Sequence, residues 1–219
     1  MFQKHSYPPG IMVNLDGERF VDEGADFRNF TYVKYGQAVI RQPQQTAFQI
    51  FDQKTLPVLR EEYRIREITK AEGHTAEGHT IEELASKLEV NPARLVRTVE
   101  QFNTAVDDKP FNPAILDRKG TRGITPPNTN RAQKLDTPPY AGFGVTCGIS
   151  FTFGGLRVDL RAQVQDLEDR PIRGLYAAGE LVGGLFYHNY PGGAGLMAGS
   201  VFGKTAGESA AADLGLKAR

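Results

Sequence analysis

The sequence predicts an α+β fold, because strand patterns, two capped helices and a glycine-rich loop followed by a helix succeed one another along the chain. The stretch "GIMVNLDGERFVDE" alternates apolar and polar residues around Asp16-Gly17, and Asp-Gly between such runs is a strong hairpin signal. We therefore expect two paired strands in a hairpin over residues 10–22. A strand is also expected over residues 46–52, "TAFQIFD", with a helix after it in "TLPVLREEYRIREI".

A tandem copy of five residues follows in "AEGHTAEGHT". Its histidines, His74 and His79, raise the possibility of a metal site. Glycine beside each histidine and the lack of a third ligand nearby favour a duplicated surface loop instead. We therefore expect no metal.

Two short helices are predicted after this repeat. Thr80 and Glu83 have the spacing of a capping box ahead of "IEELASKL". Asn91 provides a second cap, with Pro92 at the first helical position. The second helix carries an apolar stripe of Leu95, Val99 and Phe102. The two helices can therefore pack as a hairpin.

The remaining segments predict a loop and then three strands. Residues 107–140 are rich in proline and should form an irregular linker or wrapping loop. Strand character returns in "AGFGVTCGISFTFGGLRVD", "AQVQD" and "GLYAAGE".

Glycine is concentrated near the end of the chain, where ten of the 24 glycines fall between Gly174 and Gly207. "LYAAG" is typical of a buried strand, and Gly179 allows a sharp turn close to a ligand. "YPGGAGL" then leads into a helix that should begin near Ala194. The free N–H groups of such a helix start would stabilise a group that takes on negative charge, such as the pyrimidine edge of a flavin. Tight helix packing without any ligand is the alternative.

The composition excludes several classes of function. The chain has 26 basic and 26 acidic side chains and a formal net charge of zero, so neither nucleic acid nor an acidic membrane surface is expected as a partner. No stretch reads as a membrane span, so membrane association would require a partner. Cys147 cannot form an internal disulfide, and its apolar surroundings favour a buried structural thiol in a protein of the reducing cytoplasm.

Three of these motifs together resemble the flavoprotein family of fumarate reductase and succinate dehydrogenase. "GLYAAGE", followed by "GG" and a helix, resembles the last FAD-binding segment of that family, while "GIMVNLDGERFVDE" and "SFTFGGLRVD" resemble the stretches that enter and leave its capping domain. "FTFGG", "GLFYHNYPGGAG" and "DEGADF" look most like the FAD-dependent tricarballylate dehydrogenases. The resemblance implies a capping domain of mixed strands and short helices over residues 1–145, and the C-terminal portion of a Rossmann-like FAD-binding domain over residues 146–219.

The resemblance also implies a set of FAD-binding residues. Glu180 would accept hydrogen bonds from the ribityl chain, and Gly154 and Gly155 would let the returning strand pass beside the ring. The turn at Gly179 would bring the backbone near the cofactor. Backbone donors to the pyrimidine would come from Gly192, Gly193, Ala194, Gly195 and Leu196.

The catalytic candidates follow from the same resemblance and from its departures. Arg28 stands one residue away from the position of the arginine that serves as proton-transfer acid in fumarate reductases, and an ordinary surface role is its alternative. Those enzymes carry a histidine pair where this chain has Ser150 and Phe151. They also carry a substrate-clamping arginine at the position of Tyr190, and a phenol lacks the charge and the fork of a guanidinium. Tyr190, with Tyr187 and His188, would instead orient a larger acid or help to move a proton, and packing against the cofactor is the alternative.

The sequence contains no early Gly-x-Gly-x-x-Gly strand–turn–helix for the FAD pyrophosphate. We therefore expect the chain to be the C-terminal half of an FAD-dependent oxidoreductase that acts on the CH–CH bond of a di- or tricarboxylic acid. Its expected partners are an N-terminal FAD-binding half, a small carboxylic-acid substrate and an electron acceptor. FAD binding by this chain alone should be weak or absent, and the chain alone inactive. The alternatives are a flavin-dependent ketosteroid-type dehydrogenase and a catalytically silent binding or assembly module.

Overall fold

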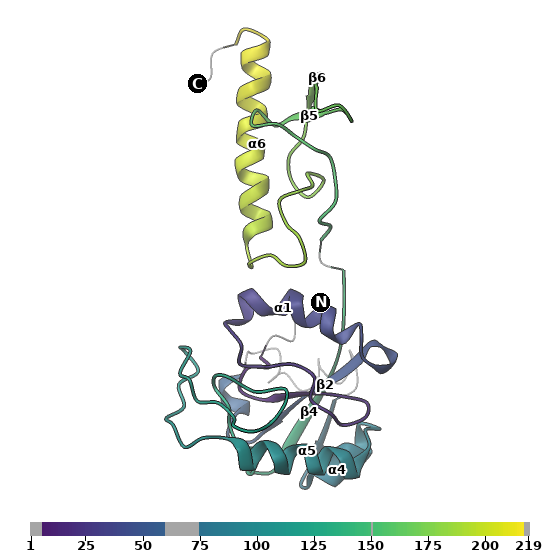
Figure 1. Cartoon of the computed structure of the whole chain (residues 1–219), viewed down its shortest axis with the longest axis vertical. Helices are drawn as coiled ribbons and strands as arrows, with labels where there is room; N and C mark the ends of the chain where they lie inside the picture. Colours follow the sequence, from purple (N-terminus) through teal and green to yellow (C-terminus); the bar gives the residue numbers. More distant parts are fainter. Residues whose placement is uncertain (1–5, 60–74, 150, 217–219) are drawn as a thin grey trace. The chain divides into compact units, whose positions relative to one another are not determined.

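The computed structural model describes residues 6–59, 75–149 and 151–216, and the chain divides into two compact units. Unit 1 is Met1–Cys147 and unit 2 is Gly148–Arg219 (Figure 1). Both units mix helices with small sheets.

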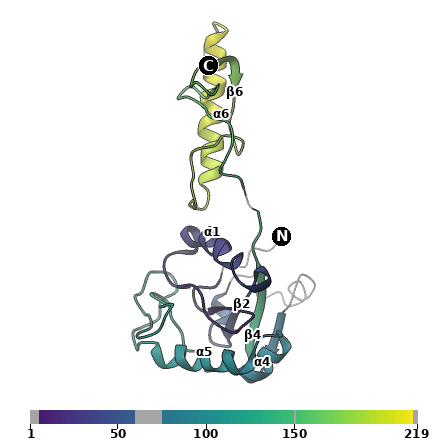
Figure 2. The ribbon, with the colours of Figure 1, turned by 45° about the vertical axis from the view of Figure 1, so that its right-hand side comes forward.

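Unit 1 is built on a four-stranded antiparallel sheet with the order β1-β2-β4-β3. Figure 2 labels its two central strands, β2 and β4. The strands are β1 (Ile11–Asn14), β2 (Thr46–Asp52), β3 (Thr75–Gly78) and β4 (Tyr140–Thr146). The strand expected over residues 46–52 is confirmed. β2 is buried along nearly its whole length because both faces of the sheet are covered.

The two faces of the sheet are covered by different helices. Ile11 and Val13 pair with Ile50 and Phe48, and all four lie in one apolar cluster with α4 (Ile81–Lys87) and α5 (Pro92–Ala105). Met12 points to the opposite face, because side chains alternate along a strand. There it packs with side chains of α1 (Arg28–Val39). Figure 1 shows the same layering of α1, sheet and helix pair.

The predicted helix caps are confirmed. The Thr80 hydroxyl accepts a hydrogen bond from the Glu83 N–H at 3.1 Å, and the Asn91 side chain accepts one from the Arg94 N–H at 3.1 Å. Glu83 in turn accepts a hydrogen bond from the backbone N–H of His79 at 2.7 Å. The apolar stripe of α5 is buried, and α4 and α5 contact each other.

The hairpin predicted over residues 10–22 forms its turn but not its second strand. The Asn14 side chain accepts hydrogen bonds from the N–H groups of Asp16 and Glu18 at 3.0 Å each, and Gly17 has a φ of +80°. Beyond the turn a single bridge joins Val13 to Arg19. The return segment leaves the sheet because the Arg19 side chain turns inward, donating to the Glu23 carboxylate and to the carbonyl of Pro126 at 2.8 Å. The prediction of two paired strands is therefore wrong.

Two further expectations concern the segment after β2. Only the 3-10 turn Leu56–Val58 of the predicted helix lies in the described part of the chain, since residues 60–74 lie outside it. His74 lies outside it too, so the histidine pair is not tested. The second copy of the tandem repeat is not a surface loop, because Thr75–Gly78 pairs with β4 as β3.

Residues 107–139 form the predicted irregular loop, and they wrap unit 1 through side-chain contacts. The backbone N–H of Thr129 donates to the Asp22 carboxylate at 2.9 Å, and the Asn130 amide donates to the carbonyl of Gly24 at 2.8 Å. The loop is thereby fixed to the segment that leads into α1.

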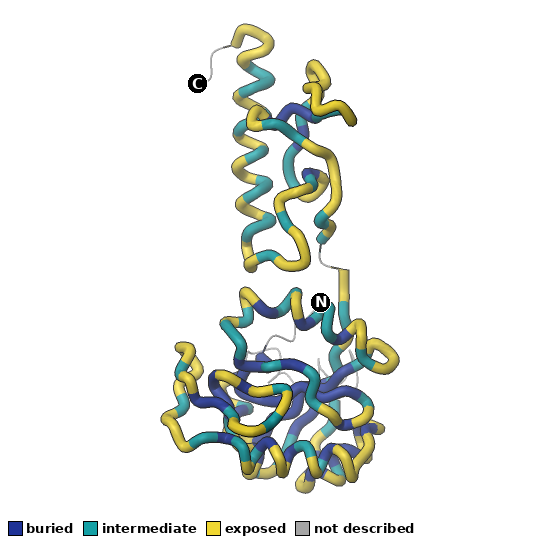
Figure 3. Tube along the Cα trace, in the orientation of Figure 1, coloured by how far each residue is buried: buried dark blue, intermediate teal, exposed yellow. Residues whose placement is uncertain are grey.

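Unit 2 contains a two-stranded antiparallel sheet of β5 (Gln163–Gln165) and β6 (Pro171–Tyr176), and one long helix, α6 (Ala194–Asp213). The predicted helix start near Ala194 is confirmed. "LYAAG" was expected to be a buried strand, but β6 is mostly exposed because β5 is its one partner strand among the described residues. Figure 3 shows α6 without a buried residue.

The described helices include none that is long and apolar enough to cross a membrane.

Candidate functional site

The start of α6 is an open helix end formed by glycines. Gly193 precedes the helix with a φ of +90°, and a Cβ placed there would meet no atom within 4 Å. No side chain caps this end and its first turn carries no acidic residue. Leu196, in the first turn, is 77% exposed. Backbone N–H groups at such an end carry partial positive charge, so the geometry suits a ligand edge that becomes negative.

Four aromatic rings pack together beside this helix start. The Tyr190 ring lies 4.8 Å from that of Phe151, 5.8 Å from that of Phe153 and 5.7 Å from that of Phe186. A Cβ on Gly195 would lie 3.8 Å from the Phe151 ring. Tyr190 was expected to take part in the chemistry, and its contacts with Phe153 and Phe186 were not predicted from the sequence. The aromatic spacing in "FTF" and "GLFYHNY" was the signal that could have revealed them.

Gly179 and Glu180 lie directly after the segment that follows β6. Gly179 has a φ of +84° and open space where a Cβ would stand. The Glu180 Oε1 atom accepts a hydrogen bond from the backbone N–H of Thr152 at 2.9 Å, and its other oxygen bonds to no described residue. Gly199 of α6 lies close to this turn, since a Cβ there would be 3.6 Å from the Gly179 Cα. Glu180 therefore joins the "FTFGG" segment to the "AAGE" turn.

Gly154 and Gly155 differ in their surroundings. A Cβ on Gly155 would lie 2.2 Å from the Leu181 carbonyl oxygen, whereas a Cβ on Gly154 would meet nothing within 4 Å. The close approach at Gly155 allows the Leu156 N–H to donate to the Leu181 carbonyl at 2.7 Å. Gly155 is thus required by the fold of unit 2 itself, and Gly154 leaves space that a cofactor could fill. Their roles toward FAD stay predictions.

Tyr187 and His188 lie on the surface of unit 2. Tyr187 is 82% exposed, and its ring centroid lies 4.1 Å from that of His188. His188 has a φ of +64°, a left-handed conformation that non-glycine residues seldom adopt. A bridge between Tyr187 and Asn189 holds this tight turn. The structure thus brings Tyr187 and His188 together, and it places Tyr190 in the neighbouring ring cluster.

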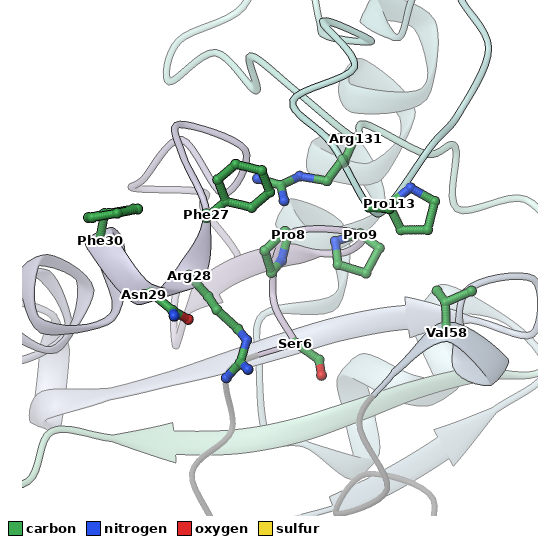
Figure 4. Close-up of a pocket in the computed structure, with 11 residues that line it drawn as sticks. Ser6, Pro8, Pro9, Phe27, Arg28, Asn29, Phe30, Val58, Pro113 and Arg131 are labelled. Carbon is green, nitrogen blue, oxygen red and sulfur yellow. The ribbon is translucent and has the colours of Figure 1, made fainter. Parts of the chain in front are cut away.

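Arg28 lies in unit 1, where it lines a pocket of about 380 Å³ at the start of α1 (Figure 4). The second arginine of this pocket, Arg131, was not predicted from the sequence, because it stands alone in an irregular loop. Figure 4 shows Phe27 and Arg28 extending from the start of α1, and Pro113 and Arg131 from the loop. The other lining residues are Ser6, Pro8, Pro9, Asn29, Phe30, Val58 and Ala114.

Two buried tyrosines stand behind this pocket. The Tyr7 hydroxyl and the Thr31 hydroxyl share a hydrogen bond of 2.6 Å, and the rings of Tyr7 and Tyr35 meet edge to face at 5.0 Å. The Tyr35 hydroxyl donates to the carbonyl of Asp22. Burial raises the pKa of Tyr7 to about 12, although the Thr31 hydrogen bond and the positive charges of Arg28 and Arg131 act in the opposite direction.

The predicted FAD residues therefore fit a flavin edge in three respects. The α6 start is uncapped, Gly179 and Gly193 leave open space, and one oxygen of Glu180 bonds to no residue that the structure describes. Arg28 belongs to unit 1 and the other candidates belong to unit 2. Within the described ranges, no three His, Cys, Asp or Glu side chains come together in a way that could hold a metal ion.

Comparison with known proteins identifies the family of the chain. Residues 2–196 match the family described as FAD binding domain. The chain is 33% identical over 204 residues to a probable fumarate reductase of Shewanella frigidimarina, covering 92% of this chain and 31% of that protein. It is 30% identical over 211 residues to a urocanate reductase of Eggerthella lenta, covering 92% and 31% respectively. The chain thus spans about a third of the length of the curated relatives named here.

Two solved structures are similar over nearly the whole chain. One is the open conformation of a flavocytochrome c3 fumarate reductase, with 30% identity, a TM-score of 0.67, and coverage of 97% of this chain and 34% of that one. The other is a 3-ketosteroid delta1-dehydrogenase from Sterolibacterium denitrificans, with 28% identity, a TM-score of 0.70, and coverage of 97% and 40%. The similarity extends over both units. The chain belongs to the FAD binding domain family, among relatives of the fumarate reductase type, and FAD is its cofactor.

Proposed function

We propose that the protein that includes this chain is an FAD-dependent oxidoreductase acting on a carbon–carbon bond next to a carboxylate. The observation that carries the proposal is the open start of α6 within a chain that matches the FAD binding domain family over residues 2–196. Bound FAD would supply the two-electron chemistry. In this proposal the reaction takes place in the cytoplasm, with an electron acceptor still to be identified.

The chain's own residues have three tasks in this proposal. Backbone N–H groups from Gly192 to Leu196 stabilise negative charge at the flavin edge, because an uncapped helix end is already oriented for it. Glu180 binds the cofactor chain with its second oxygen while the first holds Thr152 in place. The tasks of binding the acid and moving its proton are assigned to Arg28, Tyr187, His188 and Tyr190.

Within this class we favour a tricarboxylic acid of the tricarballylate type. Support comes from the "FTFGG" and "GLFYHNYPGGAG" motifs and from Tyr190, whose phenol replaces a carboxylate-clamping arginine. The names of similar proteins refer to fumarate, acrylate and urocanate, which are unsaturated acids. We assign residues 1–145 to a capping domain that covers the substrate and residues 146–219 to the FAD-binding domain.

The test uses the complete protein loaded with FAD. We expect tricarballylate to reduce an artificial dye through the flavin faster than succinate does, and reduced viologen to be oxidised slowly by fumarate. Turnover with none of these acids, in a protein that holds FAD, would overturn the proposal.

A ketosteroid-type dehydrogenase is the second candidate. It is supported by the similarity to the 3-ketosteroid delta1-dehydrogenase and by 37% identity over 145 residues to a 4-oxocyclohex-2-ene-1-carboxylate 5-dehydrogenase of Sinomonas cyclohexanicum. The exposed ring of Tyr187 would suit a ring substrate. Dye reduction with a 3-ketosteroid and with a cyclic keto acid, in parallel with tricarballylate, separates the two candidates.

A further inference from the structure

The pocket at the start of α1 has the properties of an anion site. It has a volume of about 380 Å³, within the usual range for small-molecule sites. Its lining contains two arginines and no acidic residue, and the remainder is mostly proline, phenylalanine and other apolar side chains. Rigid apolar walls with a few charged groups are typical of a site for a small acid. We call it the Arg28–Arg131 pocket.

Arg131 is a buried cation that lacks a full set of hydrogen-bond partners among the described residues. Its relative exposure is 4%, and among the described residues its guanidinium makes one hydrogen bond, from Nη2 to the Asp26 carbonyl at 2.5 Å. Its Nε atom is buried without a hydrogen-bond partner in the described part of the chain. Burial lowers the pKa of Arg131, while the charges of Asp117 and Asp26 act in the opposite direction.

The position of Arg131 is nevertheless fixed. Its guanidinium lies 5.3 Å from the centre of the Phe27 ring, and Figure 4 shows the two side chains next to each other. Its backbone N–H donates to the Asp117 carboxylate at 2.8 Å. A buried charge with unused donors is costly unless an anion completes it. Such a group, held in place at a pocket wall, is ready for an anionic ligand.

Arg28 supplies the second positive charge. It is the first residue of α1, whose 12-residue helix has no side-chain cap and no acidic residue in its first turn. Arg28 is half-buried and makes no hydrogen bond or ion pair with another described residue. The helix start and the guanidinium therefore act on an anion in the same sense.

We propose that the Arg28–Arg131 pocket binds a carboxylate group of the substrate, and that Arg131 is a specificity-determining residue that favours acids with several carboxylates. The proposal rests on the proposed function, since it takes the substrate to be a carboxylic acid. A guanidinium can bind both oxygens of one carboxylate. Two guanidinium groups therefore bind a ligand with more than one carboxylate group more tightly. Inorganic phosphate shares this chemistry, so the experiment includes it.

The experiment measures ligand binding to the complete protein in its flavin-free form by calorimetry. The ligands are tricarballylate, propionate and inorganic phosphate. We expect tricarballylate to bind more tightly than the other two. We expect Arg131→Gln and Arg28→Gln each to weaken its binding about tenfold or more, as the loss of a charge-assisted hydrogen bond implies. Arg131→Lys keeps the positive charge but loses the two-pronged guanidinium geometry. Its affinity for tricarballylate should lie between those of wild type and Arg131→Gln.

Arg122→Gln is the matched control, because Arg122 is an exposed arginine of the same loop and does not line the pocket. It should change binding less than twofold. Arg131→Gln changes a buried residue, so the fold of this variant is checked by circular dichroism. If the variant is unfolded, Arg28→Gln, at the partly exposed start of α1, tests the proposal instead. Unchanged tricarballylate binding in Arg28→Gln or in a folded Arg131→Gln overturns the proposal. Phosphate binding as tight as that of tricarballylate also overturns it.

The role of the pocket and the proposed function can fail separately in these experiments. Binding that depends on both arginines in a complete protein without turnover would refute the proposed function alone. Turnover of tricarballylate that survives both glutamine variants would refute the role of the pocket alone.

Discussion

The Glu180 carboxylate accepts a hydrogen bond from the backbone N–H of Thr152 at 2.9 Å, although the two residues lie 28 positions apart. This contact fixes the "FTFGG" segment next to the "AAGE" turn. We expect Glu180→Ala to weaken FAD binding by the complete protein about tenfold, because one hydrogen bond to the cofactor and one to Thr152 are lost together. Quenching of flavin fluorescence measures the affinity.

Glu168→Ala is the control for this variant, since Glu168 is an exposed glutamate of unit 2 that pairs with Arg170. It should leave the FAD affinity unchanged. Equal affinity of Glu180→Ala and wild type would remove Glu180 from the cofactor site.

Gly155 and Gly154 provide a matched pair that separates structural from cofactor roles. Gly155→Ala should destabilise unit 2 by several kcal/mol, since its Cβ would stand 2.2 Å from the Leu181 carbonyl oxygen. This backbone atom cannot move without disturbing the fold. Gly154→Ala should leave the melting temperature of the flavin-free protein unchanged, because the space around it is open. If the flavin ring lies beside this segment, Gly154→Ala lowers the FAD affinity. Thermal unfolding and flavin titration of both variants check the two statements.

The Asn91 cap of α5 gives a prediction for unit 1. Asn91→Ala removes the acceptor for the Arg94 N–H and should lower the free energy of unfolding by about 1 kcal/mol. Asn91→Asp keeps an acceptor and should retain most of the stability. Urea unfolding followed by circular dichroism measures both, and an equal loss in the two variants would show that the cap is not responsible.

The raised pKa of Tyr7 predicts how stability changes at alkaline pH. Burial raises the pKa from 10.0 to about 12, so between these values the unfolded chain loses a proton that the folded chain keeps. The free energy of unfolding should therefore be unaffected by Tyr7 below pH 10 and fall as the pH rises from 10 to 12, by about 2 kcal/mol. Tyr7→Phe loses the Thr31 hydrogen bond and is less stable at pH 8 by about 1 kcal/mol.

The decisive quantity is the difference in unfolding free energy between wild type and Tyr7→Phe. It should shrink between pH 8 and pH 11, because wild type alone carries the Tyr7 contribution. Tyr35, whose pKa burial also raises, is present in both proteins. A difference that stays constant with pH would mean that Tyr7 ionises at its ordinary pKa.

The elements that the sequence predicted correctly are those whose signals are local. Thr80 and Asn91 accept hydrogen bonds from N–H groups three residues away, so the sequence pattern contains the whole contact. The predicted second strand of the hairpin does not form, because the Arg19 side chain donates to Glu23 and to the carbonyl of Pro126, 107 positions away. No local pattern records such a contact. α1 was not predicted because Thr31 and Tyr35 contribute to its buried side and blur the apolar stripe.

The candidate site shows the same limit. The glycine-rich start of α6 could be read directly, since Gly193 needs a left-handed backbone conformation just before the helix. Arg131 could not be found in this way, because its guanidinium meets Asp26, which lies 105 positions earlier in the chain. The aromatic cluster around Tyr190 likewise combines rings from two separate stretches.

α6 extends over 20 residues without burying one of them, and its side chains include the exposed Leu196, Met197 and Val201. A helix with so little tertiary contact depends for most of its stability on the group that eventually packs against its exposed surface. The backbone N–H groups that would bind the flavin lie in the first turn of α6. Flavin binding and the packing of α6 should consequently occur as one cooperative event. Removal of the cofactor would then also destabilise this helix.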